Sequence, residues 1–199
     1  MPDVATRMHR PEALAVARAF VDEIEGCCER VIVAGSLRRR LAYVGDIEVC
    51  AVPKIELDGG DIFGDRPVGV NLLDDRMAEL LDAGTVTKRL DRNGTPRWGP
   101  TIKLLEYRSA PIDLFAPAEP ERFGWILVLR TGPAAFARQL VVERGRRTKD
   151  GRPGLLPVGL KPRDGWLTRR VSGERIATPD EADVFALYGL DYRHPRERS

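Results

Sequence analysis

Cysteine and histidine are scarce in this chain of 199 residues. The cysteines are Cys27, Cys28 and Cys50, an odd number without a C-x-x-C pair, and the histidines are His9 and His194. These counts argue against a zinc site, which needs several clustered Cys or His ligands. We interpret the cysteines as residues in or near the core of a protein that folds in a reducing compartment.

Long apolar runs, internal repeats and low-complexity segments are also missing. No run approaches the roughly 20 apolar residues that a transmembrane helix needs, and no signal-peptide pattern is present. We therefore expect a cytoplasmic protein without a membrane partner. The length suffices for one large domain or two small ones with a proper core.

Net charge is small, at +2, but it is unevenly distributed. Between Arg122 and Arg175 there are 13 Lys and Arg residues against 4 Asp and Glu residues. A basic segment beside an acidic remainder suits a polyanionic partner such as nucleic acid. A basic surface that only keeps the protein soluble would have the same composition.

The segment from Val31 to Lys54 organises the chain. An apolar strand ends at Gly35-Ser36, a cluster of three arginines follows, and a second strand carries Asp46 and Glu48. Because side chains alternate along a strand, these two carboxylates share one face. A Gly-Ser turn with arginine can bind an anion, and paired carboxylates can bind a hard divalent cation. The segment predicts a site for a metal–nucleotide complex; the alternative is a surface hairpin with a solvated charged edge.

Apolar periodicity and turn residues predict the remaining elements. Helices are expected at 11–24, 71–81, 134–144 and 183–189, the last with a capping box that starts at Thr178. Strands are expected at 85–90, 101–107, 111–115 and 124–129, with the Asn93-Gly94 turn between the first two. Residues 54–70 predict a solvated loop, because the spacing of Asp58, Asp61 and Asp65 matches no calcium-binding loop.

Asp113 is a lone carboxylate in the apolar strand at 111–115. A charged group on a buried strand is costly unless it has a partner. A metal ion held jointly with Asp46 and Glu48 would be such a partner, and an edge strand that faces water is the alternative.

The pattern G-S-x-R-R, followed by D-x-E on the next strand, resembles the nucleotidyltransferase signature of the family X DNA polymerases, the DNA polymerase beta family. The terminal Tyr192-to-Arg198 segment, YRHPRER, is similar to the family's closing Y-R-x-P-x-x-R, and Thr131-Gly132 matches its T-G turn. The resemblance runs from about Pro11 to the last residue, without the lyase and fingers domains of larger relatives. It implies an α/β (α+β) fold: a nucleotidyltransferase palm over residues 1–120, with a mixed sheet flanked by helices, and a small thumb-like domain over 121–199.

The resemblance also implies an activity. It is metal-dependent transfer of a nucleotide from a nucleoside triphosphate to a primer 3′-hydroxyl, as in DNA repair or gap filling. Asp46, Glu48 and Asp113 would hold Mg²⁺ or Mn²⁺ as a pair of ions. The nucleotide-binding residues would be Gly35, Ser36, Arg38, Arg39, Gly45, Leu129, Arg130, Thr131 and Gly132. The expected partner of the monomer is gapped or primer–template DNA, or RNA.

A glycine-flanked basic stretch predicts a loop that positions nucleic acid through its phosphates, without reading sequence. Its cations are Arg144, Arg146, Arg147, Lys149 and Arg152. Trp166 lies in a second basic segment, where we expect it to be a packing anchor rather than a platform for a base.

The chain departs from the family at several positions. Leu129 and Arg130 stand where relatives that select deoxynucleotides have aromatic residues, so we expect weak sugar selectivity. Glu48 stands where aspartate is commoner, and its longer side chain favours Mn²⁺. Pro133 follows the T-G turn, and we expect a cis Gly132–Pro133 peptide, with a trans proline that opens a helix as the alternative.

Two other functions fit the sequence. One is transfer to another acceptor, by a template-independent enzyme or one that modifies RNA or a small molecule. The other is a non-catalytic nucleic-acid-binding module, against which the intact set of three carboxylates argues.

Overall fold

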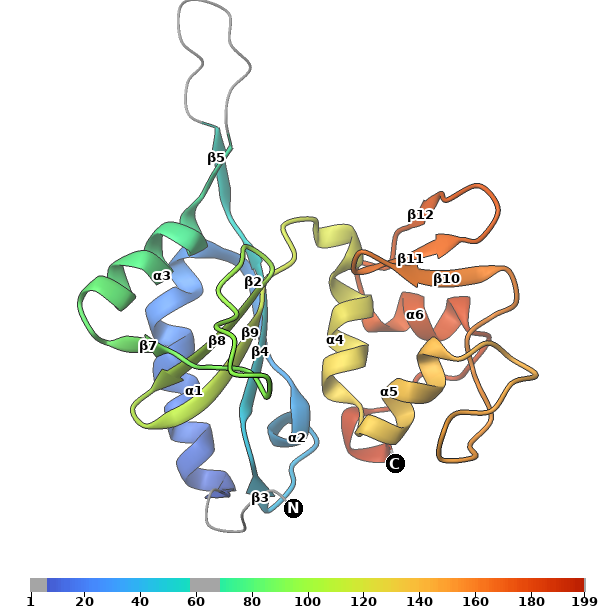
Figure 1. Ribbon diagram of the computed structural model, residues 1–199, viewed down its shortest axis with the longest axis horizontal. Coiled ribbons are helices and arrows are strands. Elements are labelled where there is room, and N and C mark those ends of the chain that lie inside the picture. Colours follow the sequence, from blue (N-terminus) through green and yellow to red (C-terminus); the bar gives the residue numbers. More distant parts are fainter. Residues whose placement is uncertain (1–6, 58–68, 199) are drawn as a thin grey trace, which may run out of the picture.

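A mixed five-stranded sheet forms the centre of the N-terminal half, residues 7–117 (Figure 1). The computed structural model describes residues 7–57 and 69–198. The strands, in spatial order, are β2 (Cys28–Val33), β4 (Ile47–Pro53), β9 (Ala110–Phe115), β8 (Ile102–Tyr107) and β7 (Val86–Lys88). β4 and β9 are parallel, and the other neighbours are antiparallel. The expected mixed α/β class, with a mixed sheet flanked by helices, is confirmed.

Two helices cover one face of this sheet, α1 (Arg10–Ile24) and α3 (Leu72–Asp82). The side chain of Asn71 caps α3 by accepting bonds from two backbone N–H groups in its first turn. The apolar side chains of these helices pack on every second residue of the central strands, such as Val49 on β4 and Ile112 on β9. The alternate residues of both strands therefore point to the opposite face.

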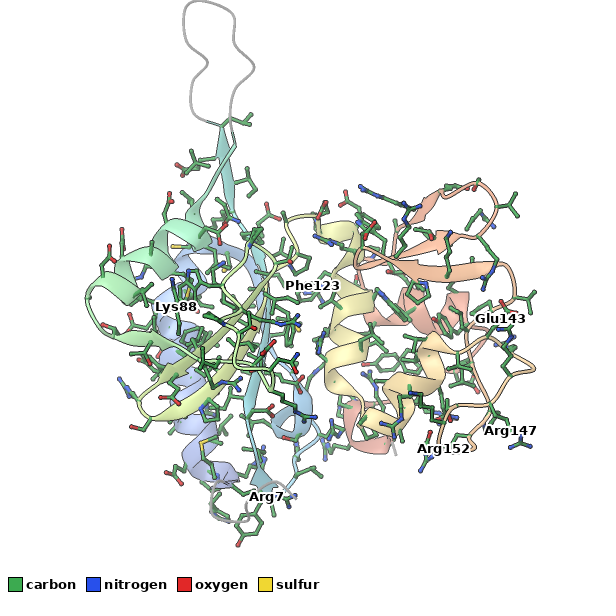
Figure 2. The ribbon with its side chains drawn as sticks, in the orientation of Figure 1. Arg7, Lys88, Phe123, Glu143, Arg147 and Arg152 are labelled. Carbon is green, nitrogen blue, oxygen red and sulfur yellow. The ribbon has the colours of Figure 1, made fainter. Side chains whose placement is uncertain are left out.

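That opposite face meets α4 (Phe123–Thr131), the first helix of the C-terminal half, residues 118–198. Figure 2 shows Phe123 between the two halves. A small apolar cluster joins sheet and helix, with Cys50 and Phe115 from the strands against Phe123 and Leu127 from α4. The central sheet is thus enclosed between α1 and α3 on one side and α4 on the other (Figure 1).

The C-terminal half has its own apolar core. α4, α5 (Ala134–Val141) and α6 (Glu181–Leu187) pack around Trp125, Phe136, Phe185 and Tyr188. A three-stranded antiparallel sheet adjoins them, made of β10 (Leu160–Arg163), β11 (Trp166–Arg169) and β12 (Arg175–Ile176). Trp166 is buried, as expected of a packing anchor.

Short elements complete the described chain. They are β1 (Met8–His9) paired with β3 (Tyr43–Val44), β5 (Ile55–Leu57) paired with β6 (Gly69–Asn71), the one-turn helix α2 (Gly35–Arg38), and 3₁₀ turns at Glu25–Cys27, Pro120–Arg122 and Pro195–Glu197. The expected loop at 54–70 is therefore wrong at its base, where β5 and β6 form a ladder. Asp58, Asp61 and Asp65 lie outside the described residues.

The strand expected at 124–129 is wrong, because these residues lie in α4. Six apolar residues in a row fit a buried strand and a buried helix equally well. α4 is buried on two sides, by the sheet and by α6, so no polar face reveals its helical period. Gly124 allows the close contact with α6, since a Cβ there would collide with the backbone of Thr178 and Asp180. No helix in the described part of the chain is long and apolar enough to cross a membrane.

Three smaller expectations are also corrected. The Gly132–Pro133 peptide is trans, and Pro133 is the N-cap residue of α5. α5 ends at Val141 rather than at 144. α6 is capped by Asp180 with Asp183, not from Thr178, whose backbone instead bonds to Glu121 and Gly124. Thr178 therefore pairs with a distant segment of the chain and does not cap α6.

Candidate functional site

The structure brings Asp46, Glu48 and Asp113 to one patch on the sheet face that looks toward α4. Glu48 and Asp113 are direct partners in the parallel pairing of β4 and β9. Asp46 immediately precedes β4 and shares a face with Glu48 by alternation. The alternation predicted from the sequence thus places the carboxylates together, while Ile47 and Val49 enter the opposite core.

Burial and repulsion between neighbouring carboxylates make ionisation of Glu48 and Asp113 unfavourable. Burial, followed by the charge of Asp46, raises the pKa of Glu48 to about 8. Burial also raises the pKa of Asp113 above its usual value, and the nearby charge of Asp46 acts in the same direction. Arg130 opposes both shifts, but the net direction is upward. The carboxylates therefore have less positive charge around them than full ionisation requires.

Among the described residues, Asp113 forms an ion pair with Arg89, which lies just after β7. No periodicity or motif in the sequence singles out this arginine. Among the residues that the structure describes, no three Asp, Glu, His or Cys side chains converge closely enough to form a ready-made metal cage. Binding an ion through all three carboxylates would therefore require their side chains to rotate toward one another.

The Gly35-Ser36 bend lies directly against the Glu48 side chain. Gly35 has φ +64°, and a Cβ there would collide with the Glu48 carboxylate. Ser36 follows in the first turn of α2, and its Oγ is buried without a hydrogen-bond partner in the described chain. A buried hydroxyl without a partner is uncommon in native proteins, and an oxygen of a bound ligand would satisfy it.

Arg38 and Arg39 tie this bend to the end of α4. Arg39 Nη1 donates to the carbonyl oxygen of Thr131 at 2.6 Å, and Arg38 Nη1 donates to Thr131 Oγ1 at 2.8 Å. The structure therefore places the predicted nucleotide-binding residues of the two halves side by side: Gly35, Ser36, Arg38 and Arg39 with Thr131 and Gly132.

Arg38 also takes part in a buried ion cluster that joins the two halves. Its guanidinium donates to both carboxylate oxygens of Glu181, at 2.8 and 2.7 Å. Arg198, whose side chain is fully buried, donates to the same carboxylate at 2.6 Å. Tyr192 OH donates to Glu181 as well, at 3.3 Å. Burial alone would raise the pKa of Glu181, but these arginine hydrogen bonds lower it below the usual value.

Most of this cluster was not recognised from the sequence as a contributor to the site. The sequence pattern places Glu181 in the capping box that starts at Thr178 and Arg198 in the terminal motif. The family resemblance makes Arg38 a nucleotide-binding residue. The available signal was the terminal motif itself, whose Tyr192 and Arg198 both contact Glu181. In the structure, Arg38 pairs with an internal carboxylate, so it supports the bend rather than facing an open site.

The other predicted residues are more dispersed. Gly45 is exposed just before Asp46, and Leu129 and Arg130 lie at the end of α4 that faces the sheet. Figure 2 shows Arg147 and Arg152 on the loop at the outer edge of the C-terminal half. The basic loop is thus separate from the carboxylates, with α5 between them (Figure 1).

The carboxylates fit a divalent cation by their chemistry. They supply oxygen ligands, which Mg²⁺ and Mn²⁺ prefer. The raised pKa values of Glu48 and Asp113 indicate that additional positive charge would stabilise the ionised form of these two carboxylates. The Ser36 hydroxyl follows Gly35 in the same bend and has no partner among the described residues, so it is available as a donor to an anion. No protein-family model matches this chain, and a search of curated proteins found no match.

Proposed function

We propose that this protein is a metal-dependent nucleotidyltransferase of the family X DNA polymerase type. The N-terminal half would be its palm and the C-terminal half a small thumb-like domain. The observation that carries the proposal is the position of Asp46, Glu48 and Asp113 on the same face of the paired strands β4 and β9, with the Gly35-Ser36 bend against Glu48. The reaction would join the 3′-oxygen of a primer to the α-phosphorus of a nucleoside triphosphate, with pyrophosphate as the leaving group.

Asp46, Glu48 and Asp113 would hold the divalent cations through their carboxylate oxygens. When bound, these cations would neutralise the phosphates and favour loss of the hydroxyl proton. Asp113, which is partly buried and paired with Arg89, would accept the proton of the attacking 3′-hydroxyl. Binding of cations would lower the pKa of Glu48 and Asp113 and keep both carboxylates ionised at neutral pH.

The triphosphate would lie along the Gly35-Ser36 bend. The missing side chain at Gly35 lets a phosphate approach the backbone closely, and Ser36 Oγ would donate to a phosphate oxygen. Arg39 would supply the positive charge, while Arg38 holds the bend against Thr131 through its pair with Glu181. Positioning and charge neutralisation are the main catalytic contributions in phosphoryl transfer.

The C-terminal half would contact the sugar and the nucleic acid. Leu129 and the Thr131-Gly132 turn would lie against the sugar. Because Leu129 and Arg130 precede this turn in place of aromatic residues, selectivity between ribonucleotides and deoxynucleotides would be weak. The basic loop would bind DNA phosphates at a distance from the chemistry. A deoxynucleotide preference above about a thousandfold would contradict this assignment of Leu129 and Arg130.

Primer extension tests the proposal. A labelled primer is offered in a one-nucleotide gap and as a single strand, with Mg²⁺ or Mn²⁺ and each nucleotide supplied alone. Extension in the gap by the complementary nucleotide supports a templated polymerase, and extension of the single strand by any nucleotide supports a template-independent transferase. No extension of either substrate with either metal ion would contradict nucleotidyl transfer to nucleic acid. Activity with Mg²⁺ equal to that with Mn²⁺ would remove the expected role of Glu48 in metal preference.

A further inference from the structure

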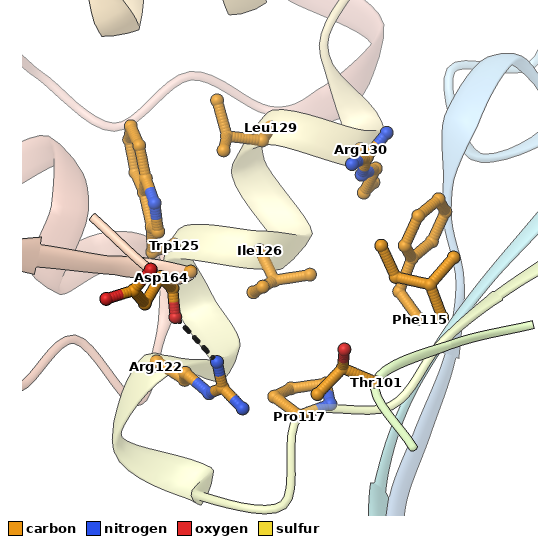
Figure 3. A pocket seen from close by; sticks show the side chains of 11 residues that line it. Thr101, Phe115, Pro117, Arg122, Trp125, Ile126, Leu129, Arg130 and Asp164 are labelled. Carbon is orange, nitrogen blue, oxygen red and sulfur yellow. Dashed lines mark hydrogen bonds between the residues drawn. The ribbon is translucent and has the colours of Figure 1, made fainter. Parts of the chain in front are cut away.

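A cavity lies beside the carboxylate patch, between α4 and the adjoining ends of β8 and β9 (Figure 3). Its volume is about 220 Å³. The walls are mostly apolar, and the side chains that form them include Phe115, Pro117, Trp125, Ile126 and Leu129. The carboxylate chemistry proposed above does not require this space.

Arg122 places a buried cation at one end of the cavity. The residue is 8% exposed. Its Nη1 donates to the carbonyl oxygen of Asp164 at 3.0 Å, and its Nη2 pairs with Glu119 at 2.6 Å. Nε has no partner in the part of the chain that the structure describes. A buried N–H without a partner is unfavourable, and an acceptor atom of a ligand in the cavity would satisfy it.

Arg130 places a second cation at the other end. Its guanidinium carbon lies 3.9 Å from the centroid of the Phe115 ring. The charge of Arg130 also acts on the nearby carboxylates of Glu48 and Asp113, but among the described residues its guanidinium donates no hydrogen bond and forms no ion pair. The carboxylate of Asp164 does not neutralise the cavity, because its side chain is 82% exposed and pairs with Arg163. Figure 3 shows Asp164 directed away from Ile126 and Arg130.

We propose that this cavity binds a nucleoside monophosphate unit, with the base among the apolar side chains and the phosphate at Arg130. Apolar and aromatic surfaces bind a base by stacking and burial, and the arginine fork binds phosphate with two donors. The volume is below the roughly 300–1,000 Å³ of pockets for larger ligands, so the cavity takes the base while the ribose and phosphate stay at its mouth. The bound unit is either a free nucleotide or an unpaired nucleotide of a nucleic-acid strand that enters this cavity.

The inference is independent of metal binding, so it can be tested in EDTA. The ¹⁵N-labelled protein is titrated with AMP, adenosine and inorganic phosphate while the indole N–H signals are followed by NMR. We expect AMP to shift the Trp125 signal and to leave that of Trp98, which does not line the cavity, unchanged. Adenosine should bind about tenfold more weakly, because it lacks the phosphate. Absence of a Trp125 shift with AMP, or equal affinity for adenosine, would overturn the proposal.

Two substitutions fill the cavity from opposite walls, Ile126→Phe on α4 and Thr101→Phe before β8. Each should weaken AMP binding at least about tenfold, since the base loses its space. Thr87→Phe on the exposed side of β7 is the matched control and should bind AMP normally. Normal binding by a folded cavity-filling variant would refute the location.

The source of the nucleotide is tested with the 5′-phosphorylated dinucleotide pdApdA. Tighter binding than that of AMP supports an unpaired nucleotide of a strand as the occupant. Equal or weaker binding supports a free nucleotide. In both cases Ile126→Phe must reduce the affinity, and its failure to do so would place the dinucleotide elsewhere and contradict the proposal.

Discussion

Glu48 and Glu181 are glutamates near the junction of the same two halves, and their pKa values shift in opposite directions. The pKa of Glu48 rises to about 8 through burial and the charge of Asp46. The pKa of Glu181 falls, because hydrogen bonds from Arg198 and Arg38 outweigh its burial. Burial is therefore common to both, and the number of partnering cations makes the difference. The charge of Glu181 is neutralised by arginines of the protein itself, whereas the positive charge near Glu48 is too small to offset its burial.

Asp113 is intermediate between the two. It pairs with Arg89, yet its pKa is still raised, first by burial and then by Asp46. One arginine offsets only part of the cost at this patch. The comparison teaches that a buried acid stabilises a joint when its charge is matched within the protein, and indicates a ligand site when its charge is left unmatched.

The largest effect is expected from Asp46→Asn. Loss of this carboxylate removes cation ligands, so nucleotide incorporation should fall at least about a thousandfold, or about 4 kcal/mol in transition-state stabilisation. Single-turnover primer extension measures the change. Glu106→Gln, which changes an exposed carboxylate on strand β8, is the matched control and should retain wild-type activity. Equal loss in both variants would contradict the special role of Asp46.

Glu181→Ala should cause the largest loss of stability. It would leave Arg198 buried without its carboxylate, which costs roughly 3–5 kcal/mol. Urea unfolding measures the free energy of unfolding. Glu174→Ala breaks an exposed pair with Arg169 and should cost no more than about 1 kcal/mol. The same loss in both variants would show that the buried cluster is not special.

Glu48→Gln should have the opposite effect on stability. The folded-state pKa of Glu48 is raised to about 8, so its contribution to stability is present below its ordinary pKa of 4.5 and is lost as pH rises toward 8. At pH 8 the variant should therefore be more stable than wild type, on the order of 2 kcal/mol. At pH 4 the two should unfold at the same urea concentration. A Glu48→Gln variant that is less stable at pH 8 would reverse the comparison.

The smallest effect is expected at the basic loop. Arg146→Gln with Lys149→Gln removes two exposed cations, which should weaken DNA binding severalfold and lower the salt dependence of log affinity by about two. Arg18→Gln with Arg108→Gln removes two cations from the N-terminal half as a control. The affinity of both double variants for a gapped duplex, measured across a salt series, would show whether the loop cations contribute more than the control cations. An unchanged salt slope would remove the loop from the DNA interface.

Much of the carboxylate site could be predicted from local sequence. Alternation on β4 places Asp46 and Glu48 together, and a lone charge in an apolar strand marks Asp113. Both rules depend only on the geometry of a strand, which the sequence pattern reveals directly. Gly35 could likewise be predicted as a bend, although the contact that excludes a Cβ comes from a different strand.

Pairing between distant segments could not be predicted in the same way. Arg89 meets Asp113, and Arg38 meets Glu181, only after the sheet and the two halves have assembled. In both pairs, the sequence around each residue contains no local pattern that identifies its partner. α4 was misassigned for a related reason: burial on two sides by separate elements removed the polar face from which a helical period is read.

Binding of Mn²⁺, counted through the loss of the free-ion EPR signal at pH 8, tests the central claim most directly. The account predicts that the wild-type protein binds Mn²⁺ and that Asp46→Asn and Asp113→Asn each weaken the affinity at least about tenfold. Glu106→Gln should bind as the wild type does. Equal Mn²⁺ affinity in all four proteins would contradict the account, because the unmatched carboxylates would then not be the cation site.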